Sequence, residues 1–191
     1  MRALLLLLIT FIVLSCHKPN TKVNIDKLIF LSYTWGPVDS TDNWNLNLHY
    51  YIEIDHSGDY HGFKNSDSLY KYKYFGGALN DSIKLRINTF LSGNYDSIYN
   101  HSDSGKIYCG ADYFLDYRYK DRRYTIKFIP QYSTEQINSI SKLFETIINK
   151  EKNDSAGAFE ISQYKKELEI LLKPSHPFPK REKPKVELNH E

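Results

Sequence analysis

The chain has 191 residues and a formal net charge of +2 at pH 7, with 25 Lys plus Arg against 23 Asp plus Glu. This near-neutral balance, without a basic stretch in the body of the chain, argues against electrostatic binding of nucleic acid. The length is enough for one domain with a hydrophobic core and short for two. Sixteen Tyr and ten Phe favour half-buried β-strands, so we expect a sheet-rich protein.

The first sixteen residues predict a secretory signal. Arg2 is followed by an apolar run from Ala3 to Leu14. That run is too short to cross a bilayer, because a spanning helix needs about 20 residues. We therefore expect residues 1–15 to be a signal peptide that is removed from the mature protein.

The residues that end this segment, Val13-Leu14-Ser15-Cys16, resemble the lipobox of bacterial lipoproteins. The resemblance implies that Cys16 becomes the first residue of the mature chain and carries several acyl chains, palmitate among them. Several chains hold a protein on a membrane essentially permanently, so membrane lipid is the first expected partner. His17, where an Asp would favour the inner membrane, favours the outer membrane. Cys109 then has no intramolecular disulfide partner, and we expect it to be buried or a free thiol.

Strand signals dominate the first half of the chain, after a polar tether at residues 16–25. Leu46 to Asp55 is the clearest strand, because apolar residues alternate with polar ones and predict one buried face. His56 to Asp59 carries turn residues that predict a hairpin. Further strands are expected at 27–34, at 60–64, and at 69–75, the last ended by Gly76-Gly77.

The second half predicts another hairpin over residues 113–129. A turn centred on Asp121-Arg122 sets Tyr117 opposite Ile126 and Leu115 opposite Phe128, which makes one face apolar and the other charged. Residues 94–110 are polar and Ser-rich, and we expect a loop there.

Three amphipathic helices are also expected. Asn80 or Asp81 can cap a helix that Gly93 ends, and Ser133 or Thr134 can cap a second that runs to about Lys150. Gln136 completes a capping-box pattern with Ser133. Residues 161–172 fit a third helix, although part of that segment also alternates as a strand would. Residues 174–191 are rich in Pro and Lys, and we expect a disordered tail.

This order of elements predicts an α+β fold: an antiparallel sheet of hairpins with two or three amphipathic helices packed on one face. The predicted organisation is a single domain at 26–173 between the lipidated tether and the tail.

Residues 26–149 also resemble an uncharacterised bacterial lipoprotein domain family. The resemblance lies in the hairpin with its Asp55–Asp59 turn, the helix that follows a Gly pair, the second hairpin and the closing helix. Members often carry paired Cys in the first loop, and this chain has none from Trp35 to Asn45. The resemblance implies a fold and no reaction.

The densest polar cluster includes His49, Glu53, Asp55 and His61, residue types that can bind Zn²⁺ or Ca²⁺. A two-residue Ser57-Gly58 turn would place His61 opposite Ile54, on the other face from His49 and Glu53. We therefore expect no metal site.

Five Asp-Ser-X triplets are similar to a bacterial O-glycosylation sequon. Asp-Ser is also common in turns and at helix caps, so the motif has two interpretations.

The sequence favours a binding or structural role in the cell envelope over an enzyme, because no catalytic set or cofactor motif is present. We expect a membrane-anchored extracytoplasmic lipoprotein whose partner is an envelope protein or a glycan. As an alternative, an accessory protein could bind polysaccharide through loop aromatics. Trp35 and Trp44 are the candidate ligand-binding residues, because both fall in a predicted loop.

Overall fold

The computed structural model describes residues 21–37, 44–66, 71–93, 98–100, 110–150, 157–159 and 161–173. Within these residues one sheet has seven strands in the order β4-β3-β2-β1-β6-β7-β5. All neighbours are antiparallel except β5 and β7, which are parallel. The strands are β1 (Lys27–Pro37), β2 (Trp44–Asp55), β3 (Asp59–Ser66), β4 (Lys71–Ala78), β5 (Ile98–Asn100), β6 (Asp112–Tyr119) and β7 (Arg122–Phe128).

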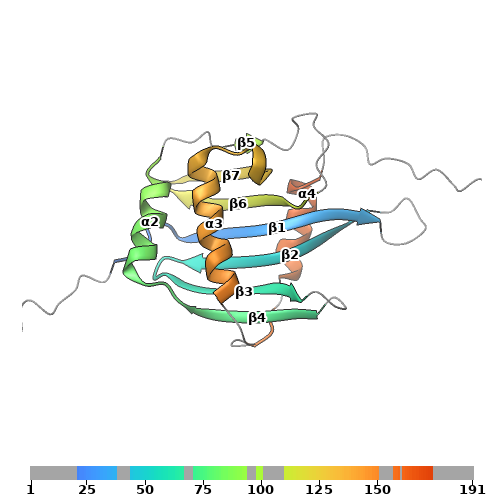
Figure 1. The fold of residues 1–191 in the computed structure, drawn as a ribbon, viewed down its shortest axis with the longest axis horizontal. Helices are drawn as coiled ribbons and strands as arrows, with labels where there is room; N and C mark the ends of the chain where they lie inside the picture. The colour runs from blue at the N-terminus through green and yellow to red at the C-terminus, as the bar shows by residue number, and fades with distance from the viewer. Residues whose placement is uncertain are drawn as a thin grey trace, which may run out of the picture.

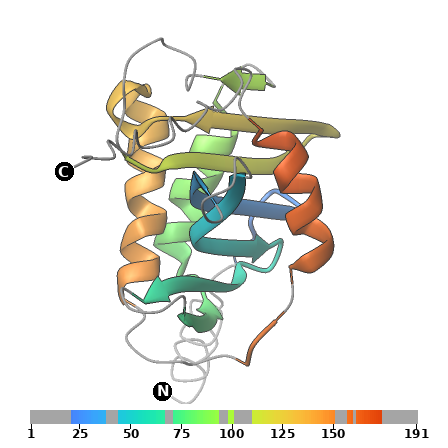
Figure 2. The same cartoon turned by 90° about the vertical axis from the view of Figure 1, so that its right-hand side faces the viewer.

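Helices cover both faces of this sheet. Helices α2 (Asp81–Leu91) and α3 (Glu135–Lys150) lie on one face, and α4 (Ser162–Leu171) lies on the other (Figures 1 and 2). The α+β class with an antiparallel sheet is confirmed. The expectation that all the helices pack on one face is not confirmed, because α2 and α3 share one face and α4 contacts the opposite face.

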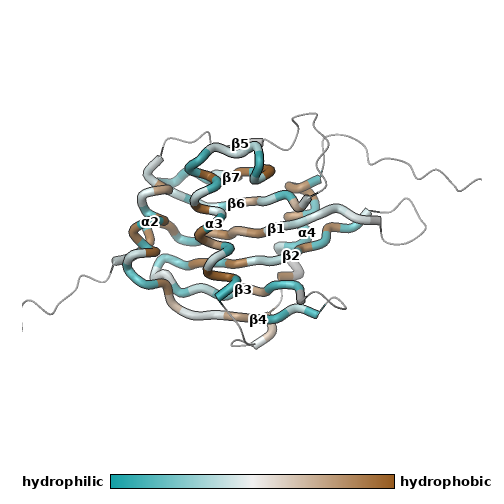
Figure 3. The backbone as a smooth tube through the Cα atoms, in the orientation of Figure 1, coloured by the Kyte–Doolittle hydropathy of each residue, from teal (hydrophilic) through white to brown (hydrophobic). Residues whose placement is uncertain are grey.

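Two hydrophobic cores follow from these three layers. The larger core joins α2 and α3 to alternate residues of the central strands, such as Leu28 and Phe30 of β1. The smaller core joins Leu168 and Leu172 of the α4 segment to the strand residues that point to the other face of the sheet, such as Ile29 and Leu31 of β1. Because both faces of the first half of β1 are buried, that half is hydrophobic, whereas the strand is pale toward its C-terminal end (Figure 3).

A β-bulge in β2 explains why the predicted single buried face of Leu46–Asp55 is wrong. The pairing with β1 shifts between Ser32 and Tyr33, so that His49 is an extra residue on β2. A bulge places two neighbouring residues on the same side and reverses the alternation beyond it. Leu46 and Leu48 therefore pack in the α4 core, whereas Ile52 and Ile54 pack in the α2–α3 core.

Helices α2 and α3 form at the positions that the capping residues predicted. The Asn80 side chain accepts a hydrogen bond from the Ile83 N–H at 2.9 Å and caps α2. The Thr134 hydroxyl accepts from the Ile137 N–H at 3.4 Å, so Thr134 rather than Ser133 begins α3. Ser133 instead ends a short 3-10 helix, Pro130–Tyr132. Helix α3 is amphipathic, as expected, and its buried stripe consists of Ile137, Ile140, Phe144, Ile147 and Ile148.

The β6–β7 hairpin has the predicted faces and a different register. Tyr117 pairs with Tyr124 rather than Ile126, and Leu115 pairs with Ile126 rather than Phe128. The turn residues are Lys120 and Asp121, with φ of 48° and 62°, which is the backbone of a two-residue type I′ turn. A shift of two residues leaves every side chain on its predicted face, because the strand period is two.

Three further boundaries differ from the expected ones. Strand β4 continues through Gly76-Gly77, because both residues pair with β3. Strand β5 falls in the segment where a loop was expected. Val23 and Ile25 are buried in the larger core, so the packed domain begins within the segment that we expected to be a tether.

Candidate functional site

The two candidate tryptophans lie in strands rather than in a loop. Trp35 is in β1 opposite Leu46, and Trp44 begins β2 opposite Pro37. The Trp35 indole N–H donates to the carbonyl oxygen of Leu172 at 3.1 Å, and its ring packs on the α4 core. Trp35 therefore helps to hold the C-terminal end of the α4 segment against the sheet, a role that its apparent loop position concealed.

The polar cluster around β2 and β3 is arranged differently from our expectation. The hairpin loop is His56 to Gly58, and Gly58 has the positive φ of 86° that closes it. His61 consequently lies opposite Glu53, not Ile54, and shares its face. Even so, no group of three or more His, Cys, Asp or Glu side chains gathers in metal-binding geometry among the residues that the structure describes.

A charged network joins α4 to the sheet. Asp116 of β6 accepts hydrogen bonds from Arg123 Nε and Nη2 at 2.9 and 2.8 Å and from the Tyr164 hydroxyl at 3.0 Å. Arg123 also donates to Glu167 of α4 at 2.8 Å. Hydrogen bonds to Asp116 are the main reason that the pKa of Arg123 is raised above its usual value. Burial, together with the nearby carboxylate of Asp116, raises the pKa of Tyr164.

A cavity of about 340 Å³ adjoins this network at the edge of α4. Its charged groups largely neutralise one another, since Asp116, Arg123 and Glu167 are already paired and Lys27 lies 3.2 Å from Glu53. These groups hold α4 in place, so we assign the cavity a structural role. Its lining is Asp26, Lys27, Ile29, Asp116, Tyr117, Arg118, Arg123, Tyr164 and Glu167.

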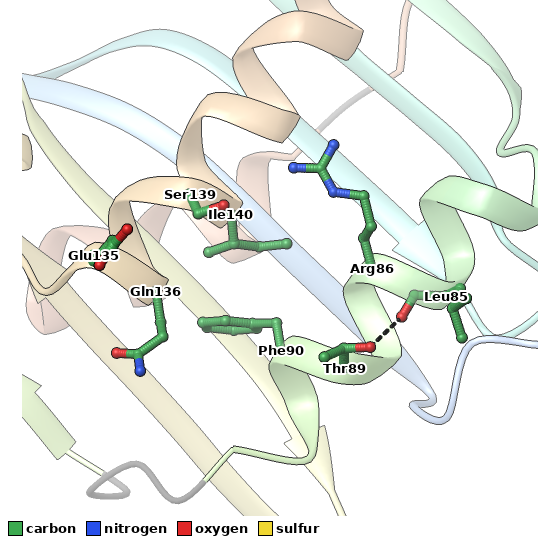
Figure 4. A pocket seen from close by; sticks show the side chains of 8 residues that line it. All are labelled: Leu85, Arg86, Thr89, Phe90, Glu135, Gln136, Ser139 and Ile140. Atoms are coloured by element: carbon green, nitrogen blue, oxygen red, sulfur yellow. Dashed lines mark hydrogen bonds between the residues drawn. The ribbon is translucent and has the colours of Figure 1, made fainter.

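The opposite face carries a groove between α2 and α3, which we call the α2–α3 groove. One cavity of about 470 Å³ lies near the start of α3, and a second of about 370 Å³ lies near its end. Both are within the volume range of small-molecule sites. The first is lined by Leu85, Arg86, Thr89, Phe90, Glu135, Gln136, Ser139 and Ile140 (Figure 4). The second is lined by Tyr60, Ala78, Leu79, Asn80, Ser82, Ile83, Arg86, Leu143, Thr146, Ile147 and Lys150.

Arg86 is the residue that the two cavities share. Figure 4 shows its guanidinium extending from α2 toward α3, above the facing side chains of Phe90 and Ile140. Arg86 is exposed, and it makes no ion pair or hydrogen bond with any other described residue. The sequence analysis missed this site, because a groove between two helices depends on how far apart the sheet holds them. The only local signal was an Arg within the apolar stripe of α2.

The start of the described chain is tied to α2. The Asn88 side chain accepts from the Asn24 N–H at 2.9 Å and donates to the Lys22 carbonyl oxygen at 2.8 Å. Val23 N–H donates to the His56 carbonyl oxygen at 3.0 Å. These bonds, with burial of Val23, place the segment that leads back to Cys16 beside one wall of the groove.

Several predictions concern residues outside the described ones. Cys16, Cys109, the signal peptide and the C-terminal tail at 174–191 all belong there. Of the Asp-Ser-X triplets, Asp81-Ser82-Ile83 is the one that lies wholly in the described chain, in the first turn of α2. None of the helices in the described part has both the length and the apolarity to span a membrane.

Comparison with known proteins assigns no family to the chain. No protein-family model matches it, and no curated protein is significantly similar to it in sequence. The resemblances to the lipobox and to a lipoprotein domain family therefore stay predictions from the sequence.

Proposed function

We propose that this protein is a lipid-anchored, extracytoplasmic binding protein of the bacterial cell envelope, held at Cys16 and taking its ligand in the α2–α3 groove. The outer membrane is the favoured location. The observation that carries the binding role is the pair of adjoining cavities with Arg86 between them, a cation that has no ion pair or hydrogen bond among the described residues. The lipobox residues Val13–Cys16 support the anchor.

A binding role is favoured because the groove presents exposed cations beside apolar side chains, and no arrangement of a nucleophile and its base is apparent among the described residues that line the cavities. None of the three cavities described above is lined by His or Cys. The carboxylate of Asp116 is engaged by Arg123 and Tyr164, which leaves it poorly placed to act as a general base. The groove offers two exposed cations, Arg86 and Lys150, beside apolar side chains, which suits recognition.

Two experiments test the proposal. Metabolic labelling with a palmitate analogue in a bacterial host should mark the wild type and a Cys109→Ala control, and should not mark Cys16→Ala. Loss of membrane association in the Cys16→Ala variant should follow. Equal labelling, or its absence, in all three would overturn the anchor.

For the groove, a photoreactive benzophenone amino acid is placed at Gln136, which is exposed and lines the first cavity. The matched control is Asn149, exposed on the same helix and lining none of the three cavities. Irradiation of intact cells should give a defined mass adduct at position 136 alone. Absence of adducts at both positions would contradict a ligand in the groove.

Binding of polysaccharide through Trp35 and Trp44 is the alternative. The bond from Trp35 to Leu172 means that a sugar stacked on the Trp35 ring competes with the α4 segment. This proposal predicts quenching of tryptophan fluorescence by a glycan panel and weaker protection of α4 in hydrogen exchange. A flat response across the panel would count against it.

A further inference from the structure

We infer that the α2–α3 groove binds a single-chain anionic amphiphile from the adjacent membrane, such as a lysophospholipid, with the acyl chain along the groove and the headgroup at Arg86. This inference rests on the proposed function and names its ligand class. Four properties of the groove support it: the apolar side chains in both cavities, a cation without a partner among the described residues, two wall hydroxyls that already have acceptors, and its position on the chain.

Apolar side chains line part of each of the two cavities. Phe90 and Ile140 face each other at one end of the groove, and Leu79, Leu143 and Ile147 line the other. The groove runs beside α2, whose 11 residues span about 16 Å. Apolar side chains spread over this length offer contacts to an acyl chain, and the polar side chains beside them suit a ligand that is amphiphilic.

Arg86 determines the preferred charge of the ligand. A guanidinium with no partner among the residues that the structure describes is available for a carboxylate or a phosphate, which it can bind through two parallel hydrogen bonds. Lys150 adds a second exposed cation at the far end of the groove, whereas Glu135 lies near the opposite end. The favoured position of an anionic headgroup is therefore the middle of the groove or its Lys150 end, and not the Glu135 end.

Two hydroxyl groups of the walls already have acceptors. The Thr89 hydroxyl donates to the Leu85 carbonyl oxygen at 2.9 Å, and the Thr146 hydroxyl donates to the Lys142 carbonyl oxygen at 2.7 Å. Both donors are thus used within their own helices. An acyl chain needs no hydrogen-bond partner and is compatible with walls used in this way, whereas a polar ligand group buried beside them without a partner would be costly.

The position of the groove brings it near the expected membrane anchor. Lys22 and Asn24 are bonded to Asn88 of α2. Lys22 is six positions after Cys16, and a fully extended chain of that length reaches roughly 20 Å. A lipidated Cys16 therefore keeps Lys22 within about 20 Å of the bilayer surface along the chain, with α2 and its groove next to it, so the adjacent membrane is the source of the ligand.

The first test measures binding of purified protein that starts at His17 and lacks the acylated Cys. Its core residues lie between Val23 and Leu172, so the described fold is retained. In calorimetric titrations, 1-dodecanoyl-lysophosphatidylglycerol and its decanoyl and tetradecanoyl homologues are added below their micellar concentrations. The Kd should fall with chain length, by up to roughly fourfold per methylene, which is the factor for complete burial. A Kd independent of chain length would overturn the inference.

Charge recognition is tested with Arg86→Ala against Lys142→Ala, which removes an exposed cation from α3 at a position that lines none of the three cavities. Arg86→Ala should weaken binding of the anionic dodecanoyl ligand about tenfold and change binding of neutral monododecanoylglycerol less than twofold. Lys142→Ala should change neither. Equal weakening of both ligands by Arg86→Ala would contradict a headgroup at Arg86.

Occupancy of the groove is tested with Ser139→Trp, which adds a ring opposite Arg86, and with Asn149→Trp as the control on the outer side of α3. The first should abolish binding and the second should not. The adduct at Gln136 separates this inference from the proposed function: a mass that matches a monoacyl lipid supports both. A glycan or peptide adduct would support the groove as a site and contradict the amphiphile.

Discussion

Asp116 and Arg123 form a two-pronged ion pair across the β6–β7 hairpin, with Nε–Oδ1 and Nη2–Oδ2 distances of 2.9 and 2.8 Å. The carboxylate is 9 % exposed and the guanidinium 43 %. The same pair meets α4 through Tyr164 and Glu167, so it links the second hairpin to the helix on that face. The attachment of α4 therefore depends on a polar network as well as on the smaller core.

Asp116→Ala should destabilise the protein by about 2 kcal/mol, because the Tyr164 hydroxyl loses its acceptor while Arg123 is still partly solvated. Amide hydrogen exchange should show α4 losing protection before the sheet. Glu167→Gln is the control: both partners of that pair are largely exposed, so the cost should stay below about 1 kcal/mol. Unchanged α4 protection in Asp116→Ala would contradict the role of the network.

Gly62 should not accept a side chain. A Cβ there would lie 2.3 Å from the Tyr51 carbonyl oxygen and 2.6 Å from Phe75 Cζ, so the backbone of β2 or β3 must move. We expect Gly62→Ala to cost at least about 2 kcal/mol in urea unfolding, as for overpacked cores. Gly157→Ala, where nothing lies within 4 Å, should be neutral within about 0.5 kcal/mol. Similar values for the two variants would show that β2 and β3 are further apart than described.

Acid should destabilise the protein through His49 at the bulge. Burial lowers the pKa of His49 below 6.5, its ordinary value. The unfolded state therefore binds more protons than the folded state between the two pKa values, and stability falls as the pH drops below about 6.5. His49→Gln should remove this part of the pH dependence, as measured by urea unfolding at pH 7.5 and pH 5. The same slope in both proteins would contradict the assignment.

A substitution in the turn of the β6–β7 hairpin should raise the stability of the protein. Lys120 and Asp121 both have positive φ, which costs a non-glycine residue about 1 kcal/mol or more. Asp121→Gly should raise stability by roughly 0.5–1 kcal/mol after the extra entropy of the unfolded glycine is subtracted. Asp121→Val should lower it, because a β-branched residue disfavours this conformation. Thermal unfolding compares the two, and a loss of stability in Asp121→Gly would contradict the type I′ turn.

Elements whose signals are local were predictable. The Asn80 cap and the buried stripes of α2 and α3 follow from side chains within one or two turns of each other. The apolar and charged faces of Tyr113–Phe128 also follow from alternation along the chain. The exact turn of this hairpin did not, because a shift of two residues preserves the faces and changes only which pairs meet.

The candidate site was hidden from sequence reasoning for a related reason. Trp35 was expected in a loop and is instead held by Leu172, 137 residues later in the chain. Arg86 belongs to a helix whose stripe was predicted correctly, yet its role depends on Ser139 and Ile140 across the groove. The spacing of residues along α2 does not indicate the distance between α2 and α3.

The sequence by itself determined the α+β class and the existence and extent of the helices, because propensity, capping and alternation act over a few residues, and the lipobox-like address at Cys16 stays a prediction from it. Only the tertiary structure decided that the His49 bulge divides β2 between two cores, that α4 covers the opposite face, and that α2 and α3 leave a groove at Arg86. Those features depend on pairing and packing between distant segments, whose free energies are set by contacts that no local pattern specifies.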